Sequence, residues 1–158
     1  MTGLSRLLLV ALALAASVAP ALAQNADKGM AVWKDRGGCY NCHGDFGEGG
    51  EGGHFPAGPN LRRTQLDEAG LREAIACGRP GTQMPYNLAT SYKTTPCFGL
   101  PVGAPPGEVT PGASLGPAEL DDLIAYLTER VVKKGQITKA ECIRYYGDPN
   151  NPTCAAYR

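Results

Sequence analysis

The run Cys39-Tyr40-Asn41-Cys42-His43 constrains this chain more than any other feature of its sequence. Two thiols at this spacing, followed directly by a histidine, are the attachment signature of a c-type haem. Each thiol can add across one vinyl group to form a thioether, and the histidine then lies beneath the iron as its proximal ligand. We therefore expect one covalently bound haem c, attached through Cys39 and Cys42 and ligated by His43.

Three other interpretations of these cysteines agree less well with the rest of the chain. A thioredoxin-type redox pair belongs in a βαβ context, and the hydrophobic pattern shows none. A zinc site needs further ligands, but no second C-x-x-C follows at the spacing of a zinc ribbon. A plain structural disulfide between Cys39 and Cys42 is the third. Export, ligand spacing and an available second iron ligand favour the haem.

Residues 1–23 have the features of a cleaved signal peptide. Arg6 supplies a positive charge, the apolar run 7–16 is short for a bilayer span, and Ala21-Leu22-Ala23 fits the cleavage rule. An uncleaved membrane anchor is the alternative, but no stop-transfer flank follows. We expect a periplasmic protein that begins at Gln24 and has no stable membrane insertion after cleavage.

The six cysteines all follow this segment. If two of them carry the haem, Cys77, Cys97, Cys142 and Cys154 remain, and an even number in an oxidising compartment indicates two disulfides. Three pairings are possible. We favour Cys77–Cys97 and Cys142–Cys154, because each closes a short local loop.

Three segments are expected to be helical: 26–36, 64–77 and 117–134. The third has the clearest amphipathic stripe, formed by Leu120, Leu123, Ile124, Leu127 and Val131. The glycine-rich stretch 44–58 is expected to be a loop with solvated carboxylates at Asp45, Glu48 and Glu51. The segment 94–116 is rich in Pro and Gly and is expected to be a long loop, and the tail 136–158 has turn signals.

A six-coordinate haem iron needs a second axial ligand, and the candidates after residue 23 are few. Met84 lies downstream of the haem run in a loop constrained by Pro80 and Pro85. Met30 precedes the run in a predicted helix, from which the opposite haem face is hard to reach. His54 is the other histidine, in a loose glycine loop. We expect Met84 to be the distal ligand, since a thioether favours Fe(II) and raises the reduction potential.

The sequence resembles the class I c-type cytochromes over about 27–134. Besides the haem run and the Gly81-Thr82-Gln83-Met84-Pro85 loop, three further parts of the chain match the family pattern: Gly29 with Trp33, Gly58-Pro59-Asn60-Leu61, and Leu123 with Tyr126. The resemblance implies that the Pro59 carbonyl accepts a hydrogen bond from His43. It also implies that Gly29 permits a close crossing of the first and last helices.

The resemblance implies an all-α fold with three main helices around one haem. We expect a cytochrome domain over 24–135 and a C-terminal extension over 136–158, stapled by a disulfide. The extension and the segment 94–116, called the insertion below, depart from the family core.

The resemblance implies an electron-transfer protein rather than an enzyme. It would carry single electrons from a dehydrogenase or quinol-oxidising complex to a cytochrome or oxidase. The alternative is a tightly bound haem subunit of a dehydrogenase, for example a quinoprotein alcohol dehydrogenase. A haem sensor or a peroxidase-like enzyme is a third possibility, and it would need an open distal position at the iron. A haem-free binding module is a fourth, and it would hold the six cysteines in three disulfides.

The charge pattern limits the partners of this chain. With 15 Lys and Arg against 15 Asp and Glu it has no formal net charge, and no basic run suited to nucleic acid is present. Near the haem, charged side chains can steer the encounter with a redox protein partner. The candidates are Lys34, Arg36, Arg79 and Lys93.

Overall fold

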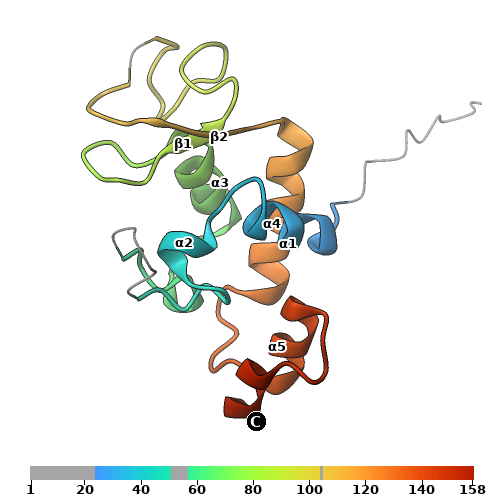
Figure 1. Ribbon diagram of the computed structural model, residues 1–158. Helices are drawn as coiled ribbons and strands as arrows, with labels where there is room; N and C mark the ends of the chain where they lie inside the picture. The colour runs from blue at the N-terminus through green and yellow to red at the C-terminus, as the bar shows by residue number, and fades with distance from the viewer. Residues whose placement is uncertain (1–23, 51–56, 104) are drawn as a thin grey trace, which may run out of the picture.

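The computed structural model describes residues 24–50, 57–103 and 105–158, so the predicted signal peptide and His54 lie outside the described residues. Three longer helices and several short elements make up the described chain (Figure 1). In chain order they are α1 (Ala26–Lys34), α2 (Tyr40–His43), the 3-10 helix η1 (Leu61–Arg63), α3 (Glu68–Cys77), β1 (Tyr86–Leu88), β2 (Pro111–Leu115), α4 (Pro117–Arg130), α5 (Lys139–Tyr146) and the 3-10 helix η2 (Pro152–Ala156). The three expected main helices are confirmed as α1, α3 and α4.

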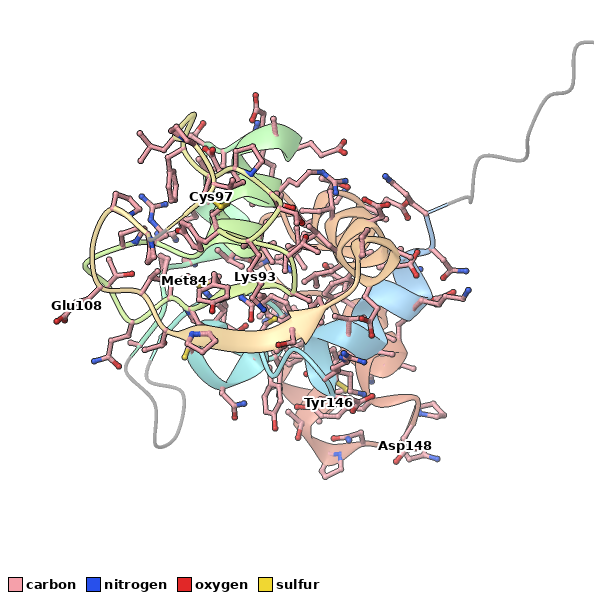
Figure 2. All side chains as sticks on the ribbon, turned by 90° about the horizontal axis from the view of Figure 1, so that it is seen from above. Met84, Lys93, Cys97, Glu108, Tyr146 and Asp148 are labelled. Atoms are coloured by element: carbon pink, nitrogen blue, oxygen red, sulfur yellow. A yellow bond between two sulfur atoms is a disulfide. The ribbon has the colours of Figure 1, made fainter. Side chains whose placement is uncertain are left out.

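Both favoured disulfides are confirmed. Cys77 at the end of α3 is bonded to Cys97 in the insertion (Figure 2), and Cys142 of α5 is bonded to Cys154 of η2. All four sulfur-bearing residues are buried, so each bridge lies inside the packed protein. Cross-links over loops of this size stabilise a fold by a few kcal/mol, mainly by restricting the unfolded chain.

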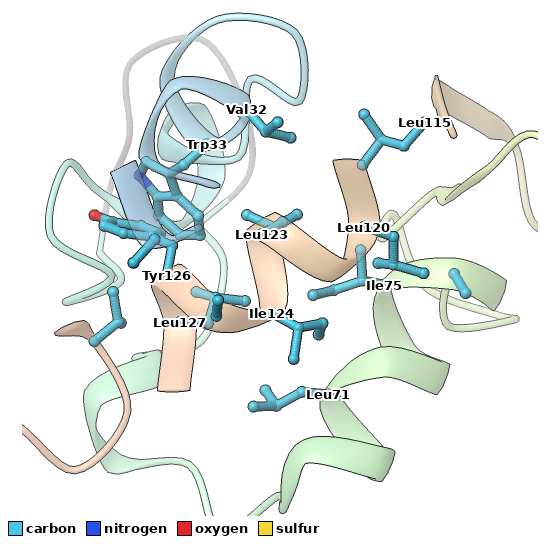
Figure 3. Close-up of a cluster of buried hydrophobic side chains, with 14 of the residues drawn as sticks. Val32, Trp33, Leu71, Ile75, Leu115, Leu120, Leu123, Ile124, Tyr126 and Leu127 are labelled. Carbon is cyan, nitrogen blue, oxygen red and sulfur yellow. The ribbon is translucent and has the colours of Figure 1, made fainter. Parts of the chain in front are cut away.

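The core is formed where α4 lies between α1 and α3 (Figure 3). Leu71 and Ile75 of α3 reach α4 from one side, and Trp33 of α1 reaches it from the other. Gly29 makes the α1–α4 crossing close, because a Cβ at this position would lie 1.9 Å from the Asp122 carbonyl oxygen. The role expected for Gly29 is therefore confirmed.

Helix α3 begins later than the predicted helical range 64–77. The Asp67 carboxylate accepts a hydrogen bond from the Gly70 N–H at 2.8 Å, so Asp67 is the N-cap and the helix begins at Glu68. At the other end, Gly78 has φ +69° and turns the chain away. Its lack of a side chain is needed, since a Cβ would lie 2.7 Å from the Tyr86 nitrogen.

The insertion is more ordered than the sequence predicts. Its last residues form β2, which pairs in parallel with β1, the strand that directly follows the Met84 loop. The expectation of an irregular loop over 94–116 was therefore wrong for 111–115. Strand β2 is five residues long and includes Pro111, Gly112 and Ser114, so it lacks the alternation of apolar and polar side chains that predicts a strand. Its extended structure therefore depends on pairing with β1 rather than on its own sequence.

The C-terminal tail contains a helix that the sequence analysis did not predict. The Thr138 side chain caps α5 by accepting from the Glu141 N–H at 3.2 Å, and Glu141 accepts from the Thr138 N–H at 2.8 Å. This capping box is visible in the sequence as T-x-x-E. No helix in the described parts of the chain has the length and apolar character that crossing a bilayer requires.

Candidate haem site

The two cysteines of the haem run are free thiols, whereas the other four are bonded in pairs. Cys39 caps the one-turn helix α2 and Cys42 lies within it, which separates the thiols by about one helical turn. Burial raises the pKa of the Cys39 thiol to about 12. Two unpaired thiols about one turn apart on a short helix fit covalent attachment of a haem.

His43 is buried and its ring is held in one orientation. Its Nδ1 lies 3.0 Å from the Pro59 carbonyl oxygen, which can only accept, so Nδ1 carries the proton and Nε2 keeps its lone pair. Burial lowers the pKa of His43, and the hydrogen bond to Pro59 partly offsets that effect. The ring is thus disposed as a neutral metal ligand with a carbonyl behind it.

Gly58 allows the two sides of this contact to approach. A Cβ on Gly58 would lie 2.7 Å from His43 Nδ1 and 2.8 Å from the Cys42 carbonyl oxygen. The Gly58 N–H also donates to the Cys42 carbonyl at 2.7 Å. The family resemblance implied the proline contact, and the structure shows that the preceding glycine is what makes room for it.

Asp45 connects the haem run to the C-terminal extension. Its carboxylate accepts hydrogen bonds from the Tyr145 hydroxyl at 3.0 Å and from the Tyr146 hydroxyl, while its carbonyl accepts from the Trp33 indole at 3.1 Å. The Asp45 carboxylate was expected to be solvated, and this was wrong. Glu48 also departs from that expectation, because it accepts from the Phe46 N–H at 2.8 Å. Glu51 lies outside the described residues.

An aromatic cluster completes the contact between this loop and the extension. The Phe46 ring is buried, and its centroid lies 5.0 Å from that of Tyr145, 6.2 Å from Tyr146 and 5.7 Å from Tyr157. Such edge and tilted arrangements are favourable for aromatic pairs. The extension is therefore packed onto the proximal side of the site by Phe46 as well as by Asp45.

Arg62 is a second connection that the sequence analysis missed. It is buried, and its guanidinium donates to the carbonyls of Phe46, Gly135 and Gln136 and to the Glu141 carboxylate. The bond to Glu141 measures 3.0 Å. An arginine beside a second arginine in a polar segment gives no sign of burial, so this role could not be inferred without the tertiary structure.

Met84 lies in a tight loop between α3 and β1 and packs half-buried against the core. The Arg79 N–H donates to the Met84 carbonyl at 3.1 Å, and the Thr82 hydroxyl accepts from the Met84 N–H at 3.2 Å while donating to Arg79 at 2.7 Å. Figure 2 shows Glu108 at the outer edge of the loops and Met84 nearer the centre of the molecule. The loop thus has a defined shape set by its own hydrogen bonds.

Met30, the other candidate ligand among the described residues, has different surroundings. Met30 lines a cavity of about 20 Å³ beside Phe46, Arg62 and Tyr145, between α1 and the extension. A larger cavity of about 360 Å³ lies along α3 and the start of the Met84 loop. The residues that line this larger cavity do not include Cys39, Cys42, His43 or Met84. The cavity is therefore separate from the proposed haem ligands.

Three of the four proposed steering residues have structural partners. Lys34 donates to the Tyr145 carbonyl at 2.8 Å and lies 4.6 Å from the centre of its ring. Arg36 donates to the Ser114 carbonyl at 3.0 Å and pairs with Glu119 at 3.2 Å. Lys93 donates to the Ala89 carbonyl at 3.3 Å. Arg79 and Lys93 are both exposed and form no ion pair with any residue that the structure describes.

Three helices packed around a C-x-x-C-H run, with an oriented histidine and a methionine loop, define a small haem protein. The cytochrome c family model matches residues 26–130, so the chain belongs to the cytochrome c family. No curated protein matches the chain, and no solved structure does. Members of this family bind haem c covalently and transfer electrons, and one haem is typical of a single domain of this kind.

Proposed function

We propose that Cys39 and Cys42 form the thioethers to the haem and that His43 and Met84 are the axial ligands of its iron. The observation that carries this proposal is the fixed His43 ring, whose Nδ1 is engaged by Pro59 and whose Nε2 is therefore the available ligand atom. The hydrogen-bonded loop around Met84 supports the distal assignment. The place of Met30 beside Arg62 and the extension argues against that methionine.

The haem supplies reversible one-electron chemistry at its iron, and the chain's contribution is to bind, orient and tune it. A thioether ligand favours the reduced iron relative to a second histidine. The Pro59 carbonyl fixes the ring of the proximal ligand. If His43 and Met84 both hold the iron, a substrate would have no free position at the metal, which favours a carrier over a sensor or a peroxidase.

The ligand set is tested by absorption spectroscopy and potentiometry of the exported holoprotein. The ferric protein should show the weak near-infrared band of sulfur-ligated haem. Met84→Ala should abolish this band and lower the reduction potential. Met30→Leu is the matched control and should change neither, because it replaces the other methionine that follows the predicted signal peptide. If Met84→Ala keeps both, another residue is the ligand.

We further propose that residues 1–23 are removed and that a cytochrome domain over 24–135 with an extension over 136–158 works in the periplasm. There it would take single electrons from a dehydrogenase or quinol-oxidising complex and pass them to a cytochrome or oxidase. Arg79 and Lys93 are the exposed cations left to steer such encounters. Their charge reversal should weaken the salt dependence of the electron-transfer rate, and a mature N-terminus at Gln24 would support the export assignment.

A second candidate is a haem subunit that stays bound to its dehydrogenase. Three large apolar side chains of the insertion favour it, because Phe98, Leu100 and Val102 are 38%, 45% and 51% exposed. Size-exclusion chromatography of the native protein separates the two candidates. A free carrier elutes as a monomer, whereas a subunit co-elutes with its dehydrogenase.

A further inference from the structure

We infer that Asn87, together with the 108–115 part of the insertion, is a positioning element for the distal ligand and sets how firmly Met84 stays on the iron. This inference rests on the proposed function, in which Met84 is that ligand. Asn87 does not touch the iron in this account. It acts through the loop that carries Met84, three residues earlier in the chain.

The Asn87 side chain joins three separate segments. It is buried, and its amide nitrogen donates to the Pro85 carbonyl at 3.1 Å and to the Ile75 carbonyl, near the end of α3, at 3.4 Å. Its amide oxygen accepts from the Ala113 N–H of β2 at 3.1 Å. One amide thus connects the residue after Met84 to a main helix and to the insertion.

Backbone contacts from the insertion reach the same loop on either side of Met84. The Gly81 N–H donates to the Glu108 carbonyl at 2.9 Å, and the Tyr86 N–H donates to the Thr110 carbonyl at 3.0 Å. Gly112 permits the approach, because a Cβ there would lie 2.3 Å from the Asn87 amide oxygen and 3.0 Å from Pro85 Cγ. The insertion therefore lies along the Met84 loop and is hydrogen-bonded to it on both sides of Met84.

The consequence follows from the competition between Met84 and any added ligand. An external ligand binds only the fraction of molecules in which Met84 has left the iron, so its apparent affinity rises in proportion to that fraction. A loop held in shape by several hydrogen bonds keeps this fraction low. Loss of the Asn87 contacts is expected to raise the open fraction, and hence the affinity, about tenfold or more.

The test is titration of the ferric holoprotein with imidazole, alongside its unfolding midpoint. Asn87→Leu removes all three contacts, and Asn87→Asp keeps an acceptor for Ala113 while losing the donor to Pro85 and Ile75. Ser91→Ala is the matched control. Its hydroxyl is also buried and donates to the Ala76 carbonyl at 2.7 Å, at the same end of α3, but has no hydrogen bond to the Met84 loop.

The inference predicts imidazole affinities at least about tenfold higher in Asn87→Leu, raised in Asn87→Asp, and within about twofold of the parent in Ser91→Ala. If Asn87→Leu yields no folded protein, Gly112→Ala replaces it in the test. The added methyl group displaces the same amide from the other side, so the imidazole affinity should again rise. Equal affinities in the Asn87 variants and Ser91→Ala would overturn the inference. If Met84→Ala itself binds imidazole no more tightly than the parent, the failure lies in the ligand assignment.

Discussion

The two sides of the haem site are supported in different ways. On the His43 side, the support comes from side chains: Asp45, Phe46 and Arg62 contact the C-terminal extension through hydrogen bonds, an ion pair and aromatic packing. On the Met84 side, it comes from backbone hydrogen bonds to the insertion, from the Cys77–Cys97 disulfide and from one buried side chain, Asn87. Two additions to the helical core thus serve one ligand each.

The difference indicates which property each addition controls. The proximal ligand directly follows two cysteines that are proposed to be bonded to the haem, so its neighbours have little effect on whether it stays bound. They add buried area and hydrogen bonds to the whole fold. The distal ligand is held by coordination and by a loop whose shape depends on hydrogen bonds with Asn87 and with the insertion. We therefore expect the extension to contribute mainly to global stability and the insertion to ligand retention.

The largest effect is expected at Arg62. Arg62→Met removes the donor to three carbonyls and the cation paired with the Glu141 carboxylate, which keeps only its hydrogen bonds from Thr138. This should lower the free energy of unfolding by about 3–5 kcal/mol. Imidazole affinity should stay within about twofold of the parent. Arg63→Met is the control, because the neighbouring side chain is exposed and should cost little. A large gain in imidazole affinity would contradict the division of roles.

The two disulfides allow the comparison to be made with the same chemistry on each side. Each bridge is removed by a double substitution, Cys77→Ser with Cys97→Ser or Cys142→Ser with Cys154→Ser. Either should lower the free energy of unfolding by about 2–4 kcal/mol, since the bridged residues are 20 and 12 positions apart. The first pair should also raise imidazole affinity, because Cys77 adjoins the Met84 loop. The second should not. Calorimetry and ligand titration of both variants would settle whether this asymmetry exists.

A moderate effect is expected at Asp45. In Asp45→Asn the two tyrosine hydroxyls lose a charged acceptor, which should destabilise the docked extension by about 1–3 kcal/mol. The Trp33 indole should keep its bond, because its acceptor is the Asp45 backbone carbonyl. Hydrogen exchange should quicken in α5 and η2 while α1 and α4 keep their protection. Uniform loss of protection would mean that the extension does not open separately.

The smallest effect concerns pH. Burial alone would raise the pKa of Glu141, but hydrogen bonds from Thr138 and Arg62 outweigh it and lower the pKa from its ordinary value of 4.5. A carboxyl with a lowered folded pKa contributes stability that is complete above the unfolded value and is lost as pH falls through the folded value. Acid unfolding below about pH 4.5 should therefore be steeper in the parent than in Glu141→Gln. Identical profiles would exclude this contribution.

The sequence predicted the parts of the site that depend on local spacing. The haem run, the methionine loop and both disulfide pairings follow from short motifs or from residues close in the chain, whereas the Gly29 crossing came from the family resemblance. Met84 as the iron ligand and the domain boundary at residue 135 stay predictions. Helix α5 was overlooked although Thr138 and Glu141 form a readable capping box, because its eight residues carry a weak apolar stripe.

The contacts that the sequence could not predict join residues distant in the chain. Asp45 and Tyr145 are 100 positions apart, and Arg62 and Glu141 are 79 apart. A single carboxylate in a glycine-rich loop and an arginine beside another arginine are typical of solvated surface. In the folded chain Arg62 is buried and Asp45 is half-buried beneath two tyrosine hydroxyls, so the usual expectation fails for both. Strand β2 could not be predicted for the same reason, because it forms only by pairing with β1, which lies earlier in the chain.

Nuclear magnetic resonance of the reduced protein, with labelled methionine methyl groups, tests the ligand assignment most directly. A methyl group bonded through sulfur to a haem iron lies over the porphyrin and is shifted far upfield by its ring current. Our account predicts one such signal, present in Met30→Leu and absent in Met84→Leu. A shifted signal that disappears in Met30→Leu, or no shifted methionine at all, would contradict it.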